Sequence, residues 1–274
     1  MRIRLVRSEK LRLRGQSQQK HMIYICLAAG KGTRFGTLGN YLQKCMYPVG
    51  LKPFVEYTLD NVVSSPLFDP DQDRIVFVVG HKQEQIRSHF GSTYKGVAIT
   101  YVEQGEALGT GHAVRVGYSA APVEGPEIAW LADSYIPQQT LDAVRHAQLR
   151  DVITVAEHDD GEPYRHRVDL ESSQGRIARS WKGSSSYVEI GCWKLSQELL
   201  NRLIESESAT LRSEDGEYRM LEILQERIDR GWKVGYVEAS EWVHLGGTKP
   251  TPEHHLRTVV GHLAPGICPD IWRG

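Results

Sequence analysis

From residue 22 onward, the chain alternates short apolar runs with segments in which apolar residues recur every three or four positions. The runs have the length of buried strands, and the recurring positions share one face of a helix. This alternation is typical of α/β proteins, in which helices cover a sheet. We therefore expect an α/β fold with strands at 22–27, 74–79, 97–102, 128–132 and 152–156.

The pattern loosens after residue 160. Residues 164–170 and 176–181, separated by Ser-Ser-Gln-Gly, are typical of a hairpin. Helical spacing returns at 197–204 and 218–228, and a further strand is expected at 233–238. Because no linker rich in proline, glycine or serine divides the chain, we expect one domain over residues 22–262, with a partly separate second lobe, and a tail over 263–274.

Composition narrows the class of protein. Apolar runs such as 75–79 are far shorter than the roughly 20 residues of a membrane helix, so a membrane-spanning protein is excluded. The four cysteines stand apart with no Cys-x-x-Cys pair, which argues against a zinc ribbon or a disulfide scaffold. Reduced thiols and a cytoplasmic location are expected.

The first twenty residues carry seven basic side chains and one acidic one, although the whole chain has a net charge of −1. Such a segment has two functional interpretations, an arm for nucleic acid or another anionic surface and a transit peptide. No apolar face recurs in it, which favours a disordered extension over 1–21 ahead of an effective start at Met22. We do not expect nucleic acid as a partner.

The most informative segment is Leu27-Ala28-Ala29-Gly30-Lys31-Gly32-Thr33-Arg34, which follows the first expected strand. Small residues let backbone N–H groups approach a polyanion, and open α/β sheets bind ligands beyond the carboxyl ends of their strands. Phe35 stands where a dinucleotide fingerprint would have its third glycine. The segment therefore predicts a phosphate site, although taken alone it also fits a plain turn.

The continuation of this loop makes a phosphate site the better interpretation. Lys44 follows, then Pro48-Val49-Gly50-Leu51-Lys52-Pro53. The series resembles the nucleotidylyltransferases that join a nucleoside triphosphate to a sugar phosphate or similar acceptor, whose signature is L-A-[AG]-G-x-G-T-R, a lysine and then G-K-P. Gln43 occupies the place of the proline usually found before that lysine. The resemblance implies a Rossmann-like three-layer α/β/α sandwich with a mostly parallel central sheet and a small β-rich acceptor lobe.

A second segment, residues 104–113, is similar to the base-binding segment of the uridylyltransferase domain that makes UDP-N-acetylglucosamine. The resemblance implies that Gln104, Gly109 and Thr110 read the uracil edge, which an amide and loop backbone groups can match. The segment also fits a helix N-terminus with Thr110 as its cap. The two interpretations are compatible.

A third segment, 128–133, is an apolar strand that ends in a carboxylate. In the family this aspartate binds the catalytic magnesium, so the resemblance implies that Asp133 holds Mg2+, an ion that prefers oxygen ligands. The alternative is that Asp133 caps the next turn. Many relatives carry a second acidic or amide ligand near the carboxyl end, where this chain has His244 or Gly246, so His244, Glu241 and water stay open as the second ligand.

The acceptor side departs more from the family. By position, Lys182 takes the place of the lysine that meets the acceptor phosphate, Glu189 stands where asparagine is common, and Tyr218 belongs to a G-E-Y segment. These differences fall on the surfaces that choose the acceptor.

The resemblance implies an enzyme that transfers a nucleoside monophosphate, from UTP or dTTP, to a phosphorylated acceptor such as a sugar 1-phosphate, with release of pyrophosphate. Arg34, Lys44 and Asp133 would be catalytic. The nucleotide-binding loop would comprise Leu27, Ala28, Ala29, Gly30, Gly32 and Thr33. Two rivals stay open, a CTP-dependent enzyme acting on a non-sugar phosphate and a regulatory protein without turnover. A homo-oligomer is also open.

Overall fold

The computed structural model describes residues 21–121, 125–157, 167–171, 176–179, 185–205, 216–245 and 259–264. The basic segment 1–20, Lys182, Gly246 and residues 265–274 lie outside this part. Within it, no helix is both long enough and apolar enough to cross a bilayer.

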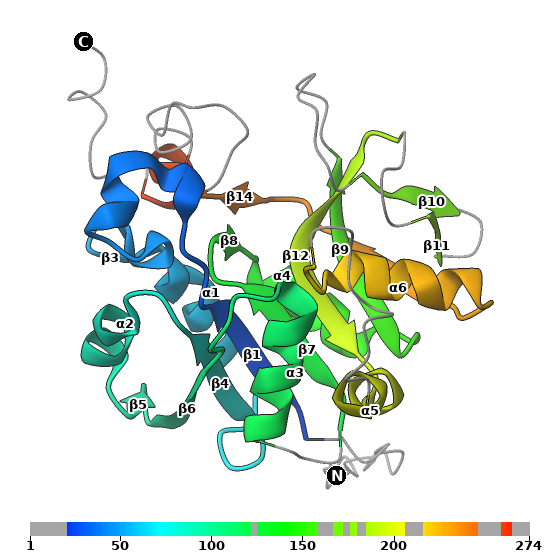
Figure 1. Cartoon of the computed structure of the whole chain (residues 1–274), viewed down its shortest axis with the longest axis horizontal. Coiled ribbons are helices and arrows are strands. Elements are labelled where there is room, and N and C mark those ends of the chain that lie inside the picture. Colours follow the sequence, from blue (N-terminus) through cyan, green and yellow to red (C-terminus); the bar gives the residue numbers. More distant parts are fainter. Residues whose placement is uncertain are drawn as a thin grey trace, which may run out of the picture.

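A ten-stranded sheet forms the centre of the described structure (Figure 1). Across the sheet, its strands are β10 (Asp169–Glu171), β11 (Arg176–Arg179), β13 (Val234–Glu238), β9 (Asp151–Glu157), β12 (Tyr187–Leu195), β7 (Glu127–Leu131), β1 (Ile23–Ala28), β4 (Arg74–Val79), β6 (Val97–Glu103) and β5 (Thr93–Tyr94). Of the seven strands from β13 to β6, only β12 runs against the others. The expected α/β class with a mostly parallel sheet is confirmed.

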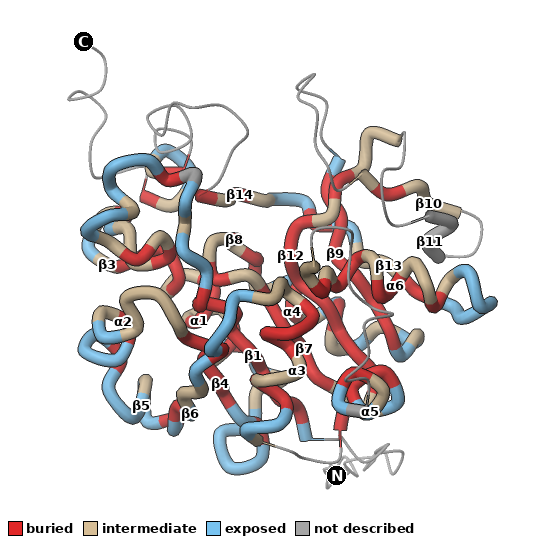
Figure 2. The backbone as a smooth tube through the Cα atoms, in the orientation of Figure 1, coloured by how far each residue is buried: buried red, intermediate tan, exposed pale blue. Residues whose placement is uncertain are grey.

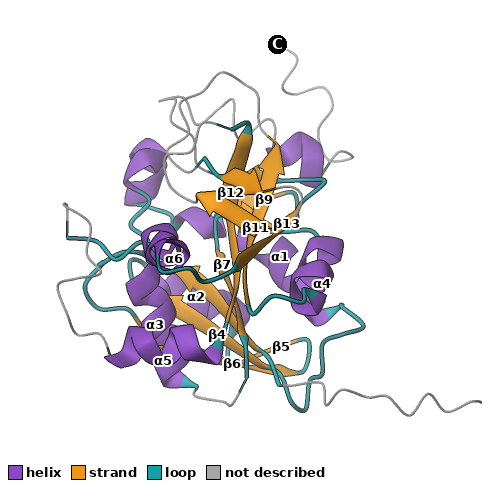
Figure 3. Cartoon of the chain, turned by 90° about the vertical axis from the view of Figure 1, so that its right-hand side faces the viewer, coloured by secondary structure: helices purple, strands orange, loops and turns teal. Residues whose placement is uncertain are grey.

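Helices cover both faces of this sheet. They are α1 (Phe54–Val63), α2 (Gln83–Phe90), α3 (Thr110–Ala120), α4 (Gln138–His146), α5 (Gln197–Glu205) and α6 (Met220–Asp229). Buried residues of α1, α2 and α4 pack in one apolar cluster, and those of α3, α5 and α6 in another. Figure 3 shows α1 and α4 on one side of the sheet and α3, α5 and α6 on the other.

Alternate side chains of the inner strands point to opposite faces of the sheet and pack in the two clusters. In β1, Tyr24 and Cys26 face the first cluster, whereas Ile23 and Ile25 face the second. Every residue of β1 is therefore buried, and Figure 2 shows the sheet as the buried centre of the molecule. This burial explains the continuous apolar runs by which the strands are recognised in the sequence.

Strand β12 was not among the expected strands. It is antiparallel to both β7 and β9, and its register with β9 shifts between Glu189 and Trp193. Gly191 lies within the shift at φ +83°, and a Cβ atom there would lie 2.6 Å from Leu131 Cδ1. The irregular backbone and the glycine hide the strand in the sequence, but they also let it pass close to the end of β7.

Helices α2 and α4 were also not expected, because few of their residues are apolar. The buried side chains of α2 are Ile86 and Phe90, and those of α4 are Thr140, Leu141 and Val144. The expected hairpin, in contrast, is present as the antiparallel pair of β10 and β11.

Short elements gather at the carboxyl edge of the sheet. They are the 3-10 helices η1 (Thr33–Asn40) and η2 (Lys44–Met46) and the strands β2 (Pro48–Val49), β3 (Lys52–Pro53), β8 (Ser134–Tyr135) and β14 (Val243–His244). A third apolar cluster, which includes Val49, Phe54, Val243 and Leu245, joins β2, the start of α1 and β14.

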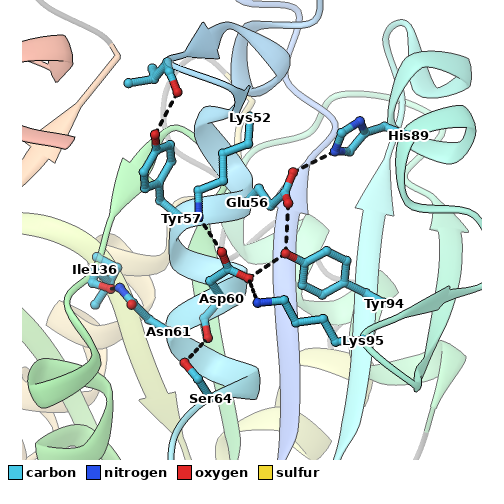
Figure 4. Close-up of polar contacts among 11 residues, drawn as sticks. Lys52, Glu56, Tyr57, Asp60, Asn61, Ser64, His89, Tyr94, Lys95 and Ile136 are labelled. Carbon is cyan, nitrogen blue, oxygen red and sulfur yellow. Dashed lines mark hydrogen bonds and ion pairs between the residues drawn. The ribbon is translucent and has the colours of Figure 1, made fainter. Parts of the chain in front are cut away.

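The outer face of α1 carries a polar cluster (Figure 4). Glu56 and Asp60, one turn apart, both accept hydrogen bonds from the Tyr94 hydroxyl. Lys52 and Lys95 form ion pairs with Asp60. Burial raises the pKa of Asp60, but its bonds to Lys52, Lys95 and Tyr94 outweigh that effect, so the pKa lies below its ordinary value. Lys52, the lysine of the Gly-Leu-Lys-Pro motif, thus fixes the turn into α1.

The first residue of β7, Glu127, is a fully buried carboxyl group. Neither carboxyl oxygen has a hydrogen-bond partner among the described residues. Burial raises the pKa of Glu127 well above its ordinary value of 4.5. The folded state therefore holds a proton that the unfolded state releases, so the free energy of unfolding falls as the pH rises above about 4.5.

We predict that Glu127→Gln removes this fall, because an amide stays neutral in both states. Its melting temperature relative to wild type should be higher at pH 8 than at pH 4.5, by about 2 °C or more. Thermal melts at the two pH values measure the difference. Glu198→Gln, at an exposed position on α5, is the matched control and should follow wild type at both. A Glu127→Gln difference that is the same at pH 4.5 and pH 8 would contradict the assignment.

Candidate active site

The candidate site lies where the chain changes direction across the sheet. Strand β1 pairs with β4 on one side and with β7 on the other. After β1 the chain continues to β4 on one side of β1, whereas after β7 it continues to β9 on the other side. The loops that follow β1 and β7 therefore diverge at this point of the sheet. Open α/β sheets bind their ligands at the carboxyl ends of such strands.

The backbone after β1 turns its carbonyl groups toward the protein. Leu27 O accepts from Ala132 N at 3.1 Å, and Ala29 O accepts from His81 N at 3.3 Å. Gln43 Nε2 donates to the two other carbonyl groups, at 2.8 Å to Ala28 O and at 3.3 Å to Gly30 O. Four successive carbonyl oxygens are thus engaged in hydrogen bonds within the protein.

The N–H groups of the same loop are available. Among the residues that the structure describes, none accepts a hydrogen bond from the backbone N–H of Gly30, Lys31 or Gly32. Gly30 and Lys31 are exposed, and Gly32 adopts a left-handed conformation at φ +60°. Successive N–H groups on a turn of this kind form a concave anion site.

Lys44 and Asp133 form an ion pair beside this loop. Lys44 opens η2, and a Cβ atom on Gly32 would lie only 3.2 Å from Lys44 Cβ, so the loop and the lysine are in close contact. Burial raises the pKa of Asp133, but the charge and hydrogen bond of Lys44 outweigh it and hold the pKa below its ordinary value. Asp133 is therefore a carboxylate at neutral pH.

Contacts from two parts of the chain fix the backbone around Asp133. Its carbonyl accepts from Leu245 N, just beyond β14, at 2.9 Å. On α1, the buried Thr58 hydroxyl donates to Ser134 O at 3.2 Å and accepts from Ile136 N at 3.0 Å. Thr58 was not among the expected site residues, and its one signal in the sequence is that a polar residue stands on the apolar face of α1.

The residues near Asp133 bear on its interpretation as a metal ligand. His244 pairs with Ser134 between β14 and β8, and its ring stacks on Trp242 with centroids 4.7 Å apart. Glu241 pairs with His262 at 3.3 Å. The described residues contain no group of three histidine, cysteine or acidic side chains that could hold a metal by themselves.

The segment after β6 orients Gln104. Gln104 N donates to Val79 O at 2.9 Å, and the side chain is buried. Its amide nitrogen donates to Gly109 O at 3.1 Å and lies 3.3 Å from His112 Nδ1. Both contacts use the amide nitrogen, and no described residue donates a hydrogen bond to the amide oxygen.

The expectation that Thr110 caps α3 is wrong. The N-cap residue is Gly109, and no side chain caps this helix end. Thr110 is the first residue of the helix, and its hydroxyl accepts instead from Met220 N, at 3.0 Å, at the start of α6. A tertiary contact thus takes the hydroxyl that local capping rules would assign to the helix.

Tyr218 holds the same loop through its backbone. Tyr218 N donates to Leu108 O at 2.7 Å, and Gly111 N donates to Tyr218 O at 2.8 Å. Its side chain is 6% exposed and belongs to the apolar cluster beneath α3 and α6. The residue expected on the acceptor side therefore packs against the segment expected to read the base.

On the acceptor side, Glu189 lies on β12 and accepts a hydrogen bond from Gly191 N. Burial raises the pKa of Glu189 to about 8, against the opposing effect of this bond. The side chain of Arg34 and the whole of Lys182 lie outside the described residues.

The comparisons with known proteins show the family of this chain. A model of the nucleotidyl transferase family matches residues 23–251. That span contains β1 and β7 with the loop, Lys44 and Asp133. The chain belongs to the nucleotidyl transferase family.

Two curated proteins are similar to parts of this chain. The bifunctional protein GlmU of Symbiobacterium thermophilum is 30% identical over 241 residues, covering 77% of this chain and 44% of that relative. The chain thus spans less than half the length of that curated relative. The UTP–glucose-1-phosphate uridylyltransferase AglF of Haloferax volcanii is 40% identical over 90 residues, covering 33% of this chain and 35% of AglF.

Solved structures share the fold. The UDP-glucose pyrophosphorylase from Acinetobacter baumanii aligns with a TM-score of 0.72 at 17% identity, over 90% of this chain and 95% of the other. A UDP-glucose pyrophosphorylase complexed with UDP-glucose gives 0.67 at 17% identity, over 87% and 97%. At these identities the likeness shows the fold.

The contact between Tyr218 and the loop that precedes α3 predicts a contrast between two glycines. Gly105 and Gly109 both have positive φ, but a Cβ atom on Gly105 meets nothing within 4 Å, whereas one on Gly109 would lie 2.5 Å from Tyr218 O. Gly109→Ala should lower the free energy of unfolding by about 1–3 kcal/mol more than Gly105→Ala. Urea unfolding of the two variants measures this, and equal losses would show that the loop does not depend on Tyr218.

Proposed function

We propose that this protein transfers a nucleoside monophosphate from a nucleoside triphosphate to a phosphorylated acceptor, with release of pyrophosphate. One observation carries the proposal. The loop after β1 has its carbonyl groups bonded inward and its Gly30–Gly32 N–H groups available, next to Lys44 and Asp133. A polyphosphate fits such a set of donors, since the backbone dipoles and the lysine attract anions.

In this reaction an oxygen of the acceptor phosphate attacks the α-phosphorus, and the bond to the leaving pyrophosphate breaks. Two anions must approach each other, so most of the catalysis has to come from positioning and charge stabilisation. The loop N–H groups would bind the phosphate tail, and Lys44 and Arg34 would neutralise its oxygens. No side-chain nucleophile is needed.

We propose Asp133 as the protein ligand of Mg2+. Its carboxylate is a hard oxygen donor, and Mg2+ is commonly held by one or two carboxylates together with substrate phosphates and water. This mode fits the described residues, which hold no cluster of three such side chains. When bound, the ion would stabilise charge on the phosphate oxygens.

For the location we propose the cytoplasm, because Cys26, Cys45 and Cys192 are buried free thiols.

For the acceptor we propose a sugar 1-phosphate. GlmU is similar over most of this chain, and AglF is named as a glucose-1-phosphate enzyme. Lys182 would meet the acceptor phosphate, and Glu189 and Tyr218 would line the acceptor side.

We predict that the purified protein releases pyrophosphate from UTP and glucose 1-phosphate in the presence of Mg2+. Asp133→Asn should abolish this turnover, because the near-isosteric amide removes the negative charge, and far-UV circular dichroism should show an intact fold. A coupled pyrophosphate assay measures both proteins. If Asp133→Asn keeps near-normal activity, the metal assignment fails. If wild type releases no pyrophosphate with any nucleotide and any phosphorylated acceptor tested, the proposed function fails.

The orientation of Gln104 predicts the base. The amide oxygen matches the N3–H donor of uracil and thymine, whereas cytosine presents an acceptor there. An unmatched buried acceptor costs about 1–3 kcal/mol, so kcat/KM for UTP and dTTP should exceed that for CTP by about ten- to a hundredfold. Gln104→Leu is the control and should reduce this ratio. A preference for CTP in wild type would reverse the assignment and favour a cytidylyltransferase.

A further inference from the structure

Gln43 is a buried amide that joins the phosphate loop to its surroundings. It is 3% exposed. Its Nε2 donates to Ala28 O and Gly30 O, at 2.8 and 3.3 Å, and its Oε1 accepts from Cys45 N at 2.7 Å. Both ends of the amide are used, so its orientation is fixed.

The backbone of Gln43 is held from the other side by α2. Gln43 N donates to Gln85 Oε1 at 2.7 Å, and Gln85 Nε2 donates to Tyr41 O at 2.8 Å. Gln85 thus contacts the backbone of this segment but not the loop carbonyls, which only the Gln43 side chain reaches. The neighbour of Gln43 in the chain is Lys44, so one short segment positions both the lysine and the loop.

We propose that Gln43 is a positioning residue that orients the loop for triphosphate binding, an inference that rests on the proposed function. The two carbonyl groups that it binds flank the Ala29–Gly30 peptide. If either carbonyl turned outward, its oxygen would face the polyanion and repel it. A loop with glycines at 30 and 32 has much backbone freedom, so an outside restraint is needed to keep the N–H groups outward.

The chemistry of this restraint requires an amide. Two carbonyl oxygens need a donor, while the N–H of Cys45 needs an acceptor, and a glutamine side chain supplies both. The proline usual at this position in the family signature can supply neither. This chain therefore restrains the loop by a side-chain contact that the family signature does not contain.

Three variants test the proposal. Gln43→Glu keeps the shape and the acceptor for Cys45 but places a carboxylate oxygen against the two carbonyls. Gln43→Leu removes both functions. Gln85→Leu is the matched control, because it removes an amide from the same network but leaves the amide on the loop in place. Calorimetry with inorganic pyrophosphate and with UTP gives dissociation constants, and initial rates give KM for UTP and for the acceptor.

For Gln43→Glu and Gln43→Leu we expect the dissociation constant for UTP to rise by about tenfold or more. Losses of this size are typical when a side chain that orients the ligand-binding groups is removed. KM for UTP should rise in parallel, whereas KM for the acceptor should stay within about twofold of wild type. Gln85→Leu should change the UTP constant by less than about threefold. The ratio of the Gln43→Glu constant to that of wild type should shrink from pH 8 to pH 6, because a protonated glutamate can again donate.

Equal UTP affinity in wild type and both Gln43 variants would overturn the proposal, as would a parallel loss of UTP and acceptor affinity. Dissociation constants do not depend on the fraction of protein that is active, so partial misfolding of Gln43→Leu does not obscure the result. If wild type turns over and the Gln43 variants bind UTP as wild type does, the role of Gln43 is rejected and the proposed function stands. Absence of triphosphate binding in wild type would reject the proposed function.

Discussion

The direction of the backbone between β1 and η1 determines what the rest of the site can do. A peptide group that turns its carbonyl outward repels an anion, and one that turns its N–H outward attracts it. Here the carbonyls of residues 27–30 are bonded to three separate parts of the protein. With these carbonyls bonded inward, the N–H groups of Gly30, Lys31 and Gly32 have no acceptor among the described residues.

The sheet brings the second half of the site to this loop. Because β1 and β7 are adjacent and parallel, the segments after them begin side by side, and Ala132 N reaches Leu27 O. Asp133 then lies next to Lys44, whose charge keeps the carboxylate ionised. Contacts from Thr58 on α1 and from Leu245 beyond β14 keep the aspartate in place. The site therefore depends on elements that are far apart in the sequence.

The separation of these elements along the chain explains which parts of the fold and of the candidate site could be predicted from the sequence. The inner parallel strands are buried on both faces, so their apolar runs identified them correctly. The glycine loop was proposed as a site from its position at a strand end, and Asp133 from the resemblance to the family. Strand β12 was missed because Gly191 and a register shift break its pattern. Gln43 appeared only as a departure from the family signature, since its role comes from contacts 13 and 15 residues away. Tyr218 likewise supports the loop that precedes α3 through backbone bonds, which no side-chain pattern reveals.

Amide NMR with 15N-glycine tests most directly whether the loop N–H groups bind the triphosphate. On titration with UTP, the amide protons of Gly30 and Gly32 should move downfield as they form charge-assisted hydrogen bonds. Gly91 and Gly96, at the turns beside β5, should keep their resonances. Unchanged Gly30 and Gly32 signals under saturating UTP would show that the loop is not the phosphate site.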